Sequence, residues 1–148
     1  HRDASYRQYQ IGMCSYQELT SIDRDPAVTR AALKEFQTLL VKYPGSPYEE
    51  EAKKYIATCK ERLAEYELYV GKFYHKKGSY QAALGRLERL IKDYPGSAAE
   101  KDALYYIGLS YQERGDKAKA ISAFENLAAR YPDMANEAGK HITKLKGP

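Results

Sequence analysis

The chain has 148 residues, 30% of them charged, and 24 Lys and Arg against 20 Asp and Glu give a net charge of +4. Basic residues are interleaved with acidic ones nearly everywhere, which argues against the basic stripe of a nucleic-acid-binding protein. No apolar run approaches the roughly 20 residues that a membrane-spanning helix requires.

The length accommodates one domain or a few repeats that share a core. The first residues, HRDASYRQYQ, do not have the apolar form of a signal peptide. We therefore expect either a processed or excised piece of a longer protein, or a cytoplasmic protein.

Three segments end in Tyr-Pro and carry apolar residues at the same five offsets. The segments are ALKEFQTLLVKYP (32–44), ALGRLERLIKDYP (83–95) and AISAFENLAARYP (120–132). The shared spacing places the apolar residues on one side of a helix. Proline cannot continue the backbone hydrogen bonds of a helix, so each helix should end there.

The first repeat is expected at about 5–45. It begins with YQIGMCSY (9–16), and relative to the later repeats it carries eight extra residues in or near TSIDRDPA. This insertion predicts a long turn at 20–27.

Each Tyr-Pro-Gly-Ser stretch should be a hinge that leads into the next helix. Ser46 is followed three positions later by Glu49, and Ser97 by Glu100. This spacing predicts capping boxes, in which the serine and the glutamate satisfy each other's free backbone amides.

A long helix is expected at 47–77, since this stretch contains Gly71 as its only glycine and no proline after Pro47. At 1.5 Å per residue it measures on the order of 45 Å. It and the helix that follows form the second repeat, at about 47–96. A third repeat at 98–132 and a basic helix at 134–146 complete the chain.

The last two repeats align without a gap and share a pattern of small, aromatic, turn and apolar residues. Gly71, Tyr74, Gly78, Ala83, Leu87 and Pro95 match Gly108, Tyr111, Gly115, Ala120, Phe124 and Pro132. This resembles the tetratricopeptide (TPR) pattern, although Glu67 and Leu104 stand where that pattern commonly has tryptophan. We expect an all-α, TPR-like, right-handed helical solenoid of about seven helices, with residues 1–148 in a single solenoid.

Nothing in the sequence forms a nucleophile, base and orienting group, so we expect no enzyme and no cofactor. Cys14 and Cys59 are too far apart in sequence for a metal-binding pair, and only three His are present. The two cysteines are either small apolar core residues or, in an oxidising compartment, one disulfide.

Repeat solenoids bind polypeptides on their extended surface, and in TPR proteins the first helix of each pair generally lines the groove. That position selects Tyr6, Tyr9, Met13 and Tyr16 in the first repeat, Leu68, Lys72, His75 and Lys76 in the second, and Tyr105, Leu109, Gln112 and Glu113 in the third. Alternatively, several of these residues pack against the next repeat.

The insertion IDRD (22–25), the hinge KYPGSPY (42–48) and the helix LAEYELYVGKFY (63–74) are not part of a generic TPR. From about Tyr6 to Tyr131 the chain resembles the BamD (YfiO or ComL) family, the TPR lipoproteins of the outer-membrane β-barrel assembly machinery. The resemblance implies a C-terminal portion at the periplasmic face of the outer membrane. It also implies that a signal peptide, a lipid anchor and N-terminal repeats lie outside this sequence.

The same resemblance implies docking to a periplasmic POTRA domain of the barrel subunit BamA, with other Bam lipoproteins as further partners. Unfolded outer-membrane proteins would be recognised by the absent N-terminal half. For docking we single out Arg86 and Arg89 in GRLERL, since both flank an apolar helix stripe and can present guanidinium groups to a carboxylate. A periplasmic location also favours the Cys14–Cys59 disulfide.

Two alternatives remain at the sequence level. The segment 94–132 also resembles the C-terminal repeats of periplasmic YbgF/CpoB proteins, which work with the Tol system. The chain would otherwise be an accessory domain of a cell-envelope enzyme, which requires a catalytic domain beyond one of its ends.

Overall fold

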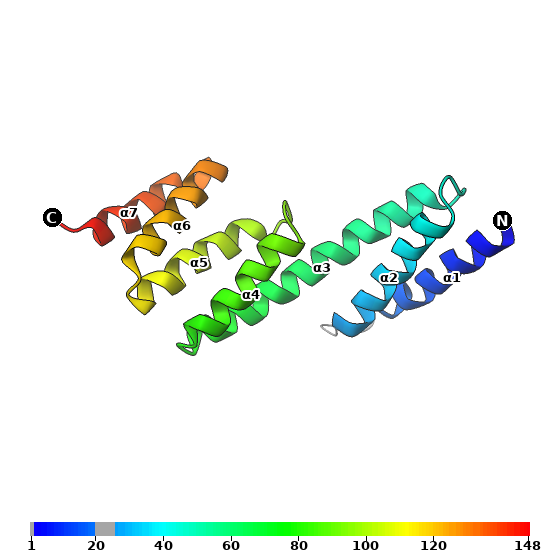
Figure 1. The fold of residues 1–148 in the computed structure, drawn as a ribbon, viewed down its shortest axis with the longest axis horizontal. Helices are drawn as coiled ribbons and strands as arrows, with labels where there is room; N and C mark the ends of the chain where they lie inside the picture. The colour runs from blue at the N-terminus through cyan, green and yellow to red at the C-terminus, as the bar shows by residue number, and fades with distance from the viewer. Residues whose placement is uncertain (1, 20–25) are drawn as a thin grey trace. The chain divides into compact units, whose positions relative to one another are not determined.

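The structure, a computed structural model, describes residues 2–19 and 26–148. The described residues form α1 (Arg2–Leu19), α2 (Pro26–Lys42), α3 (Glu49–Lys76), α4 (Tyr80–Asp93), α5 (Glu100–Arg114), α6 (Lys117–Arg130), a short 3-10 helix η1 (Pro132–Met134) and α7 (Ala135–Lys146) (Figure 1). Within those ranges there are no strands, and the all-α, TPR-like fold is confirmed. The long helix predicted at 47–77 is α3. Of the predicted turn at 20–27, residues 20–25, which include the IDRD insertion, lie outside the described residues.

The chain divides into two compact units, the first ending at Tyr66 and the second comprising Glu67–Pro148. The boundary falls inside α3, so this one helix contributes to both units. A single solenoid over residues 1–148 stays a prediction.

The first unit packs α1, α2 and the N-terminal part of α3 around one apolar cluster. Its buried members are Ala32, Phe36, Leu39, Ala52, Ile56 and Cys59. Phe36 lies at the centre, stacked on Tyr55 of α3 with ring centroids 5.3 Å apart. The buried face of α2 is the stripe that the sequence pattern predicts.

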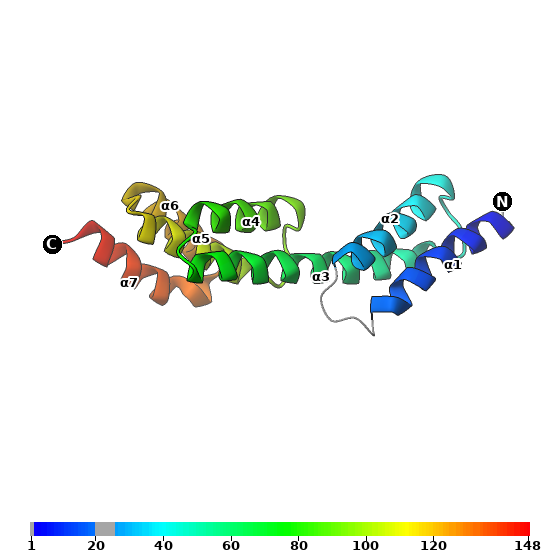
Figure 2. The ribbon, with the colours of Figure 1, turned by 90° about the horizontal axis from the view of Figure 1, so that it is seen from below.

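The second unit contains the rest of α3 and the helices α4 to α7. Figure 2 shows α4 running alongside the C-terminal part of α3. The core includes Leu87 and Leu90 of α4, Ala103 of α5, and Phe124 and Leu127 of α6, all fully buried. The helix α7 packs against α6 and contributes the buried Ala138.

A glycine allows close packing in each helix pair. A Cβ atom built on Gly12 would lie 2.6 Å from the Phe36 ring, one on Gly71 2.5 Å from Leu87, and one on Gly108 2.7 Å from the Phe124 ring. Contacts this short are incompatible with a side chain, so the small residue of the TPR pattern is required by packing.

The hinges end each second helix in the same way. The backbone amides of Tyr43, Tyr94 and Tyr131 each donate to a leucine carbonyl four residues earlier, at 2.9 Å. In the first two hinges the glycine after proline has a positive φ, 75° at Gly45 and 79° at Gly96, which favours glycine over any residue with a Cβ.

The predicted capping boxes form only in part. Glu49 and Glu100 do accept a backbone hydrogen bond, but from Gly45 at 3.5 Å and Gly96 at 2.9 Å instead of from the serines. The Ser97 hydroxyl is buried without a hydrogen-bond partner. The Ser46 hydroxyl accepts a hydrogen bond from the Tyr48 amide at 3.2 Å. The predicted register is nevertheless wrong, because a turn follows each serine and the helix starts two residues later than a serine cap requires.

Glu100 instead organises a buried polar network at the second hinge. Its carboxylate is fully buried, pairs with Arg130 at 2.6 Å and accepts hydrogen bonds from the Tyr131 hydroxyl at 2.7 Å and the Gly96 amide at 2.9 Å. Burial alone would raise the pKa of this carboxyl, but the hydrogen bonds from Gly96 and Tyr131 and the charge of Arg130 hold it below its ordinary value.

Candidate partner-binding site

In the first unit, the predicted groove residues of α1 contact the beginning of the next repeat. Tyr9 stacks on Tyr48 with ring centroids 4.7 Å apart, and Tyr16 lies against Tyr55 at 4.4 Å. Tyr6 also reaches Tyr48, at 5.8 Å, but remains 48% exposed. Tyr9 therefore packs α1 against the residue that precedes α3 and Tyr16 packs it against α3 itself, while about half of Tyr6 stays exposed.

His75 and Lys72, predicted groove residues of α3, lie against α5. The Nδ1 atom of His75 is 2.9 Å from the hydroxyl of Ser110, which is fully buried, and its ring meets Tyr106 edge to face. The ammonium group of Lys72 lies over the Tyr106 ring, 5.4 Å from its centroid. Burial lowers the pKa of His75, partly opposed by the charge of Glu113, and so favours the neutral imidazole.

Tyr105 and Gln112, predicted groove residues of α5, contact α7 in turn. The Tyr105 hydroxyl donates to Glu137 at 3.4 Å and lies 3.3 Å from Nε2 of His141. The Nδ1 atom of the same imidazole is 3.0 Å from the side-chain oxygen of Gln112. The His141 ring stacks on Phe124 with centroids 4.6 Å apart, which joins this contact to the core.

These contacts recur from α1 to α3, from α3 to α5 and from α5 to α7. We call the contact between successive first helices the seam. Six of the predicted groove residues lie in the seam: Tyr9, Tyr16, Lys72, His75, Tyr105 and Gln112. In the structure these six residues therefore pack against the next repeat, which was the alternative to groove binding. A partner-binding role for them stays a prediction.

Arg86 projects from α4 and pairs with a buried carboxylate. Its Nη1 atom lies 3.4 Å from Oε1 of Glu67, and the side chains are 32% and 3% exposed, respectively. The other carboxylate oxygen, Oε2 of Glu67, is buried without a hydrogen-bond partner. The fold therefore holds Arg86 at Nη1, while about a third of its side chain remains exposed.

Arg89, the second predicted docking residue, is exposed on α4. Glu67 was not among the predicted site residues, although its position in the repeat carried a signal. It occupies a position that is commonly tryptophan in TPRs, and a carboxylate at a packing position needs a cationic partner.

The two cysteines are both free thiols in the structure, Cys14 exposed and Cys59 buried. The disulfide considered above is not formed, because Cys59 belongs to the apolar cluster of the first unit whereas Cys14 is on an exposed face of α1. Burial raises the pKa of Cys59 to about 11, with Arg62 opposing it, so this thiol stays protonated and unreactive.

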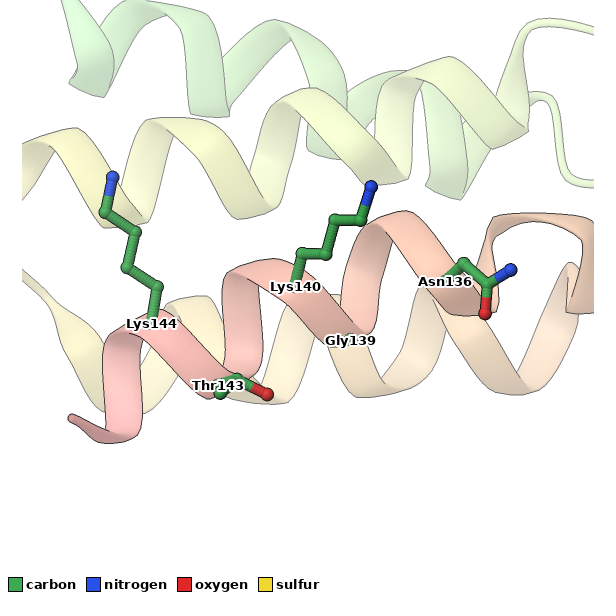
Figure 3. Close-up of a pocket in the computed structure, with 5 residues that line it drawn as sticks. All are labelled: Asn136, Gly139, Lys140, Thr143 and Lys144. Carbon is green, nitrogen blue, oxygen red and sulfur yellow. The ribbon is translucent and has the colours of Figure 1, made fainter. Parts of the chain in front are cut away.

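A shallow depression on α7 is lined by Asn136, Gly139, Lys140, Thr143 and Lys144. Figure 3 shows Lys140 and Lys144 extending in the same direction from this helix. A Cβ atom on Gly139 would meet nothing within 4 Å, so the depression is open surface. Across residues 2–19 and 26–148, no group of three His, Cys, Asp or Glu side chains is placed to hold a metal ion. Nor does any helix of these ranges have the length and apolarity needed to cross a membrane.

Paired helices with crossing glycines, proline hinges and side-chain seams define a TPR-like repeat protein, a class that presents surfaces to other polypeptides. Residues 1–125 match the family model described as YfiO, outer membrane lipoprotein. The chain belongs to this family.

Curated relatives agree with the family match. The outer membrane protein assembly factor BamD of Vibrio cholerae is 42% identical over 82 residues, which cover 55% of this chain and 34% of the relative. BamD of Pasteurella multocida is 33% identical over 113 residues, covering 70% of this chain and 44% of the relative. BamD of Haemophilus influenzae is 35% identical over 92 residues, covering 60% and 35%. The chain thus spans less than half the length of these relatives.

Proposed function

We propose that this chain is part of a non-enzymatic scaffold that assembles β-barrel proteins at the periplasmic face of the outer membrane. The family match and the BamD relatives, named as outer membrane protein assembly factors, support this role. Within it, the described helices dock to a POTRA domain of the barrel subunit BamA. Other Bam lipoproteins and unfolded outer-membrane proteins are proposed as partners of the assembly, the latter through N-terminal repeats. Membrane attachment would use a lipid anchor outside this sequence.

The observation that carries the docking proposal is the partly exposed side chain of Arg86 on α4. Four predicted groove residues of α3 and α5 are engaged in the seam, whereas Arg86 is partly exposed and Arg89 is exposed on α4. Arginine is suited to such a contact, because its planar group can donate two parallel hydrogen bonds to one carboxylate.

The test is binding of the purified chain to the periplasmic POTRA domains of BamA from the same organism. We expect saturable binding that Arg86→Glu weakens at least about tenfold, equivalent to 1.4 kcal/mol. Arg89→Glu is the matched control, with the same change of charge on the same helix at an exposed residue. It should cost less, because an exposed charge contributes little to a protein contact.

Two checks make this experiment decisive. Arg86→Glu places a carboxylate beside Glu67, so circular dichroism must show that the variant is folded. A charge reversal of the partner acid should then restore binding to Arg86→Glu. Absence of binding by the folded wild-type chain would overturn the docking proposal and favour the Tol-associated scaffold instead.

A further inference from the structure

Glu67 and Arg86 occupy two positions that have an equivalent in each of the three repeats. The first position lies four residues before the glycine at the helix crossing. The second directly precedes the large side chain that packs on this glycine. The three repeats fill these two positions with Gln8 and Glu35, Glu67 and Arg86, and Leu104 and Ala123, respectively.

The residue pairs at these two positions differ in charge among the three repeats. In the first repeat, Nε2 of Gln8 donates to the carboxylate of Glu35 at 2.8 Å and to its backbone oxygen, also at 2.8 Å. In the third repeat both residues are apolar, and Leu104 is only 4% exposed. The third repeat therefore packs with two uncharged residues at these positions. The ion pair of the second repeat is thus not needed for packing.

A buried ion pair is also an inefficient way to stabilise this place. Removing a carboxylate from water costs free energy that a partner repays only with good geometry and further hydrogen bonds. Glu100 meets this requirement with three donors at 2.6 to 2.9 Å. Glu67 has Arg86 at 3.4 Å, and its Oε2 atom has no hydrogen-bond partner.

We propose that Glu67 is a positioning residue for Arg86. By engaging Nη1 from the inside, its carboxylate holds the guanidinium in one orientation and directs its other N–H groups toward a carboxylate on the partner. Arginine carries five N–H donors, so one guanidinium can bridge an internal and an external carboxylate. This inference rests on the docking function proposed above and adds the device that prepares the contact.

We therefore expect the Arg86 side chain to lose part of its conformational entropy when the chain folds, before the partner binds. Ordering a long side chain at an interface weakens binding, and fixing it beforehand removes that loss. Without Glu67 the guanidinium would sample several orientations, and the contact would form less often.

The first experiment compares four chains in binding to the same POTRA domains: wild type, Glu67→Leu, Arg86→Ala and the double variant. Leu and Ala are the residues of the third repeat, so the double variant reproduces a pair that this fold already accommodates. We expect Glu67→Leu to weaken binding by roughly three- to tenfold. Arg86→Ala should weaken it more, and the double variant should equal Arg86→Ala, because Glu67 acts only through Arg86.

Glu67→Gln supplies the rescue variant. Its amide oxygen keeps an acceptor for Arg86, as the side chain of Gln8 keeps a polar contact with Glu35 in the first repeat. Binding should therefore recover toward the wild-type value. Circular dichroism at each step separates weaker binding from loss of fold.

A second readout uses the free chain alone. In nitrogen-15 NMR spectra, the Arg86 side-chain N–H signals should be restricted in mobility in the wild type and become averaged in Glu67→Leu. A purely structural role of Glu67 would not predict this change at Arg86 in a chain that remains folded.

The outcomes separate the two proposals. Absence of binding by the wild type overturns docking, and the positioning role falls with it. If Arg86→Ala weakens binding but Glu67→Leu binds as tightly as the wild type or tighter, docking stands and positioning is wrong. An unchanged Arg86 mobility in Glu67→Leu, or independent effects of the two substitutions, would also contradict positioning.

Discussion

At the scale of single residues, the glycines of the chain have different physical tasks. Where two helices cross, there is no room for a side chain at Gly12, Gly71 or Gly108. At the hinges, glycine is needed because the backbone has a positive φ at Gly45 and Gly96. Gly85 on α4 has neither task, because a Cβ atom there meets nothing within 4 Å.

This difference predicts opposite effects of the same substitution. Gly108→Ala should destabilise the chain by about 1–3 kcal/mol, because the new Cβ atom would overlap the fully buried Phe124 ring. Gly85→Ala should instead stabilise it by up to about 1 kcal/mol through helix propensity. Urea unfolding followed by circular dichroism measures both, and a neutral Gly108→Ala would show that the crossing can open without cost.

Glu100 gives a residue-scale prediction for acid stability. A carboxyl whose pKa is lowered by folding contributes stability that is present above its unfolded value, near 4.5, and is lost as the pH falls through the folded value. Glu100→Gln should therefore destabilise the chain at pH 7 by about 1.5–3 kcal/mol, and the difference from wild type should shrink below about pH 4.5. Unfolding curves from pH 7 to pH 3 test this, and a difference independent of pH would exclude an ionised Glu100.

At the scale of helices, each first helix is joined to the next by side chains in the seam. The contacts change in character along the chain, from tyrosine ring contacts of α1 with Tyr48 and Tyr55 to imidazole hydrogen bonds between α3 and α5 and between α5 and α7.

His75 should make the contact between α3 and α5 sensitive to mild acid. Its folded pKa is lowered by burial, so the unfolded chain takes up the proton first as the pH falls through 6.5. The stability of the second unit should therefore decrease from pH 7.5 to pH 5.5 and level off below the folded pKa of His75. In His75→Gln, thermal unfolding across this range should depend less on pH, and an equal dependence in both proteins would assign it to other groups.

At the scale of the whole molecule, two compact units share the long helix α3. Unfolding one unit while the other remains folded requires α3 to be broken inside a continuous hydrogen-bonded stretch. We therefore expect the intact helix to couple the unfolding of the two units.

A proline in the middle of α3 should remove this coupling. Glu65 is exposed and adjoins the unit boundary, so Glu65→Pro removes no buried side chain but should cost about 3 kcal/mol in helix stability. Glu50→Pro is the control, because the first turn of a helix tolerates proline. By hydrogen exchange in increasing urea, the two units should lose protection together in wild type and Glu50→Pro, and separately in Glu65→Pro. Joint loss in all three would place the coupling elsewhere.

The sequence was sufficient for features that depend on local chemistry. The repeated apolar offsets and Tyr-Pro stretches predicted the helices α2, α4 and α6 and their ends, because a helical stripe and a proline stop act within a few residues. The unbroken stretch after Pro47 predicted α3. The capping boxes were predicted in the wrong register, since the turn between serine and glutamate depends on how the following helix packs.

The sequence by itself determined a TPR-like chain of this family, because spacing, glycines and prolines carry that information locally. Only the tertiary structure decided what the site residues contact. Tyr9, His75 and Gln112 proved to lie in the seam, Cys14 and Cys59 are free thiols, and Arg86 is held by a buried Glu67 nineteen residues earlier in the chain. Such contacts depend on which faces of separate helices meet, and no pattern within one helix specifies that.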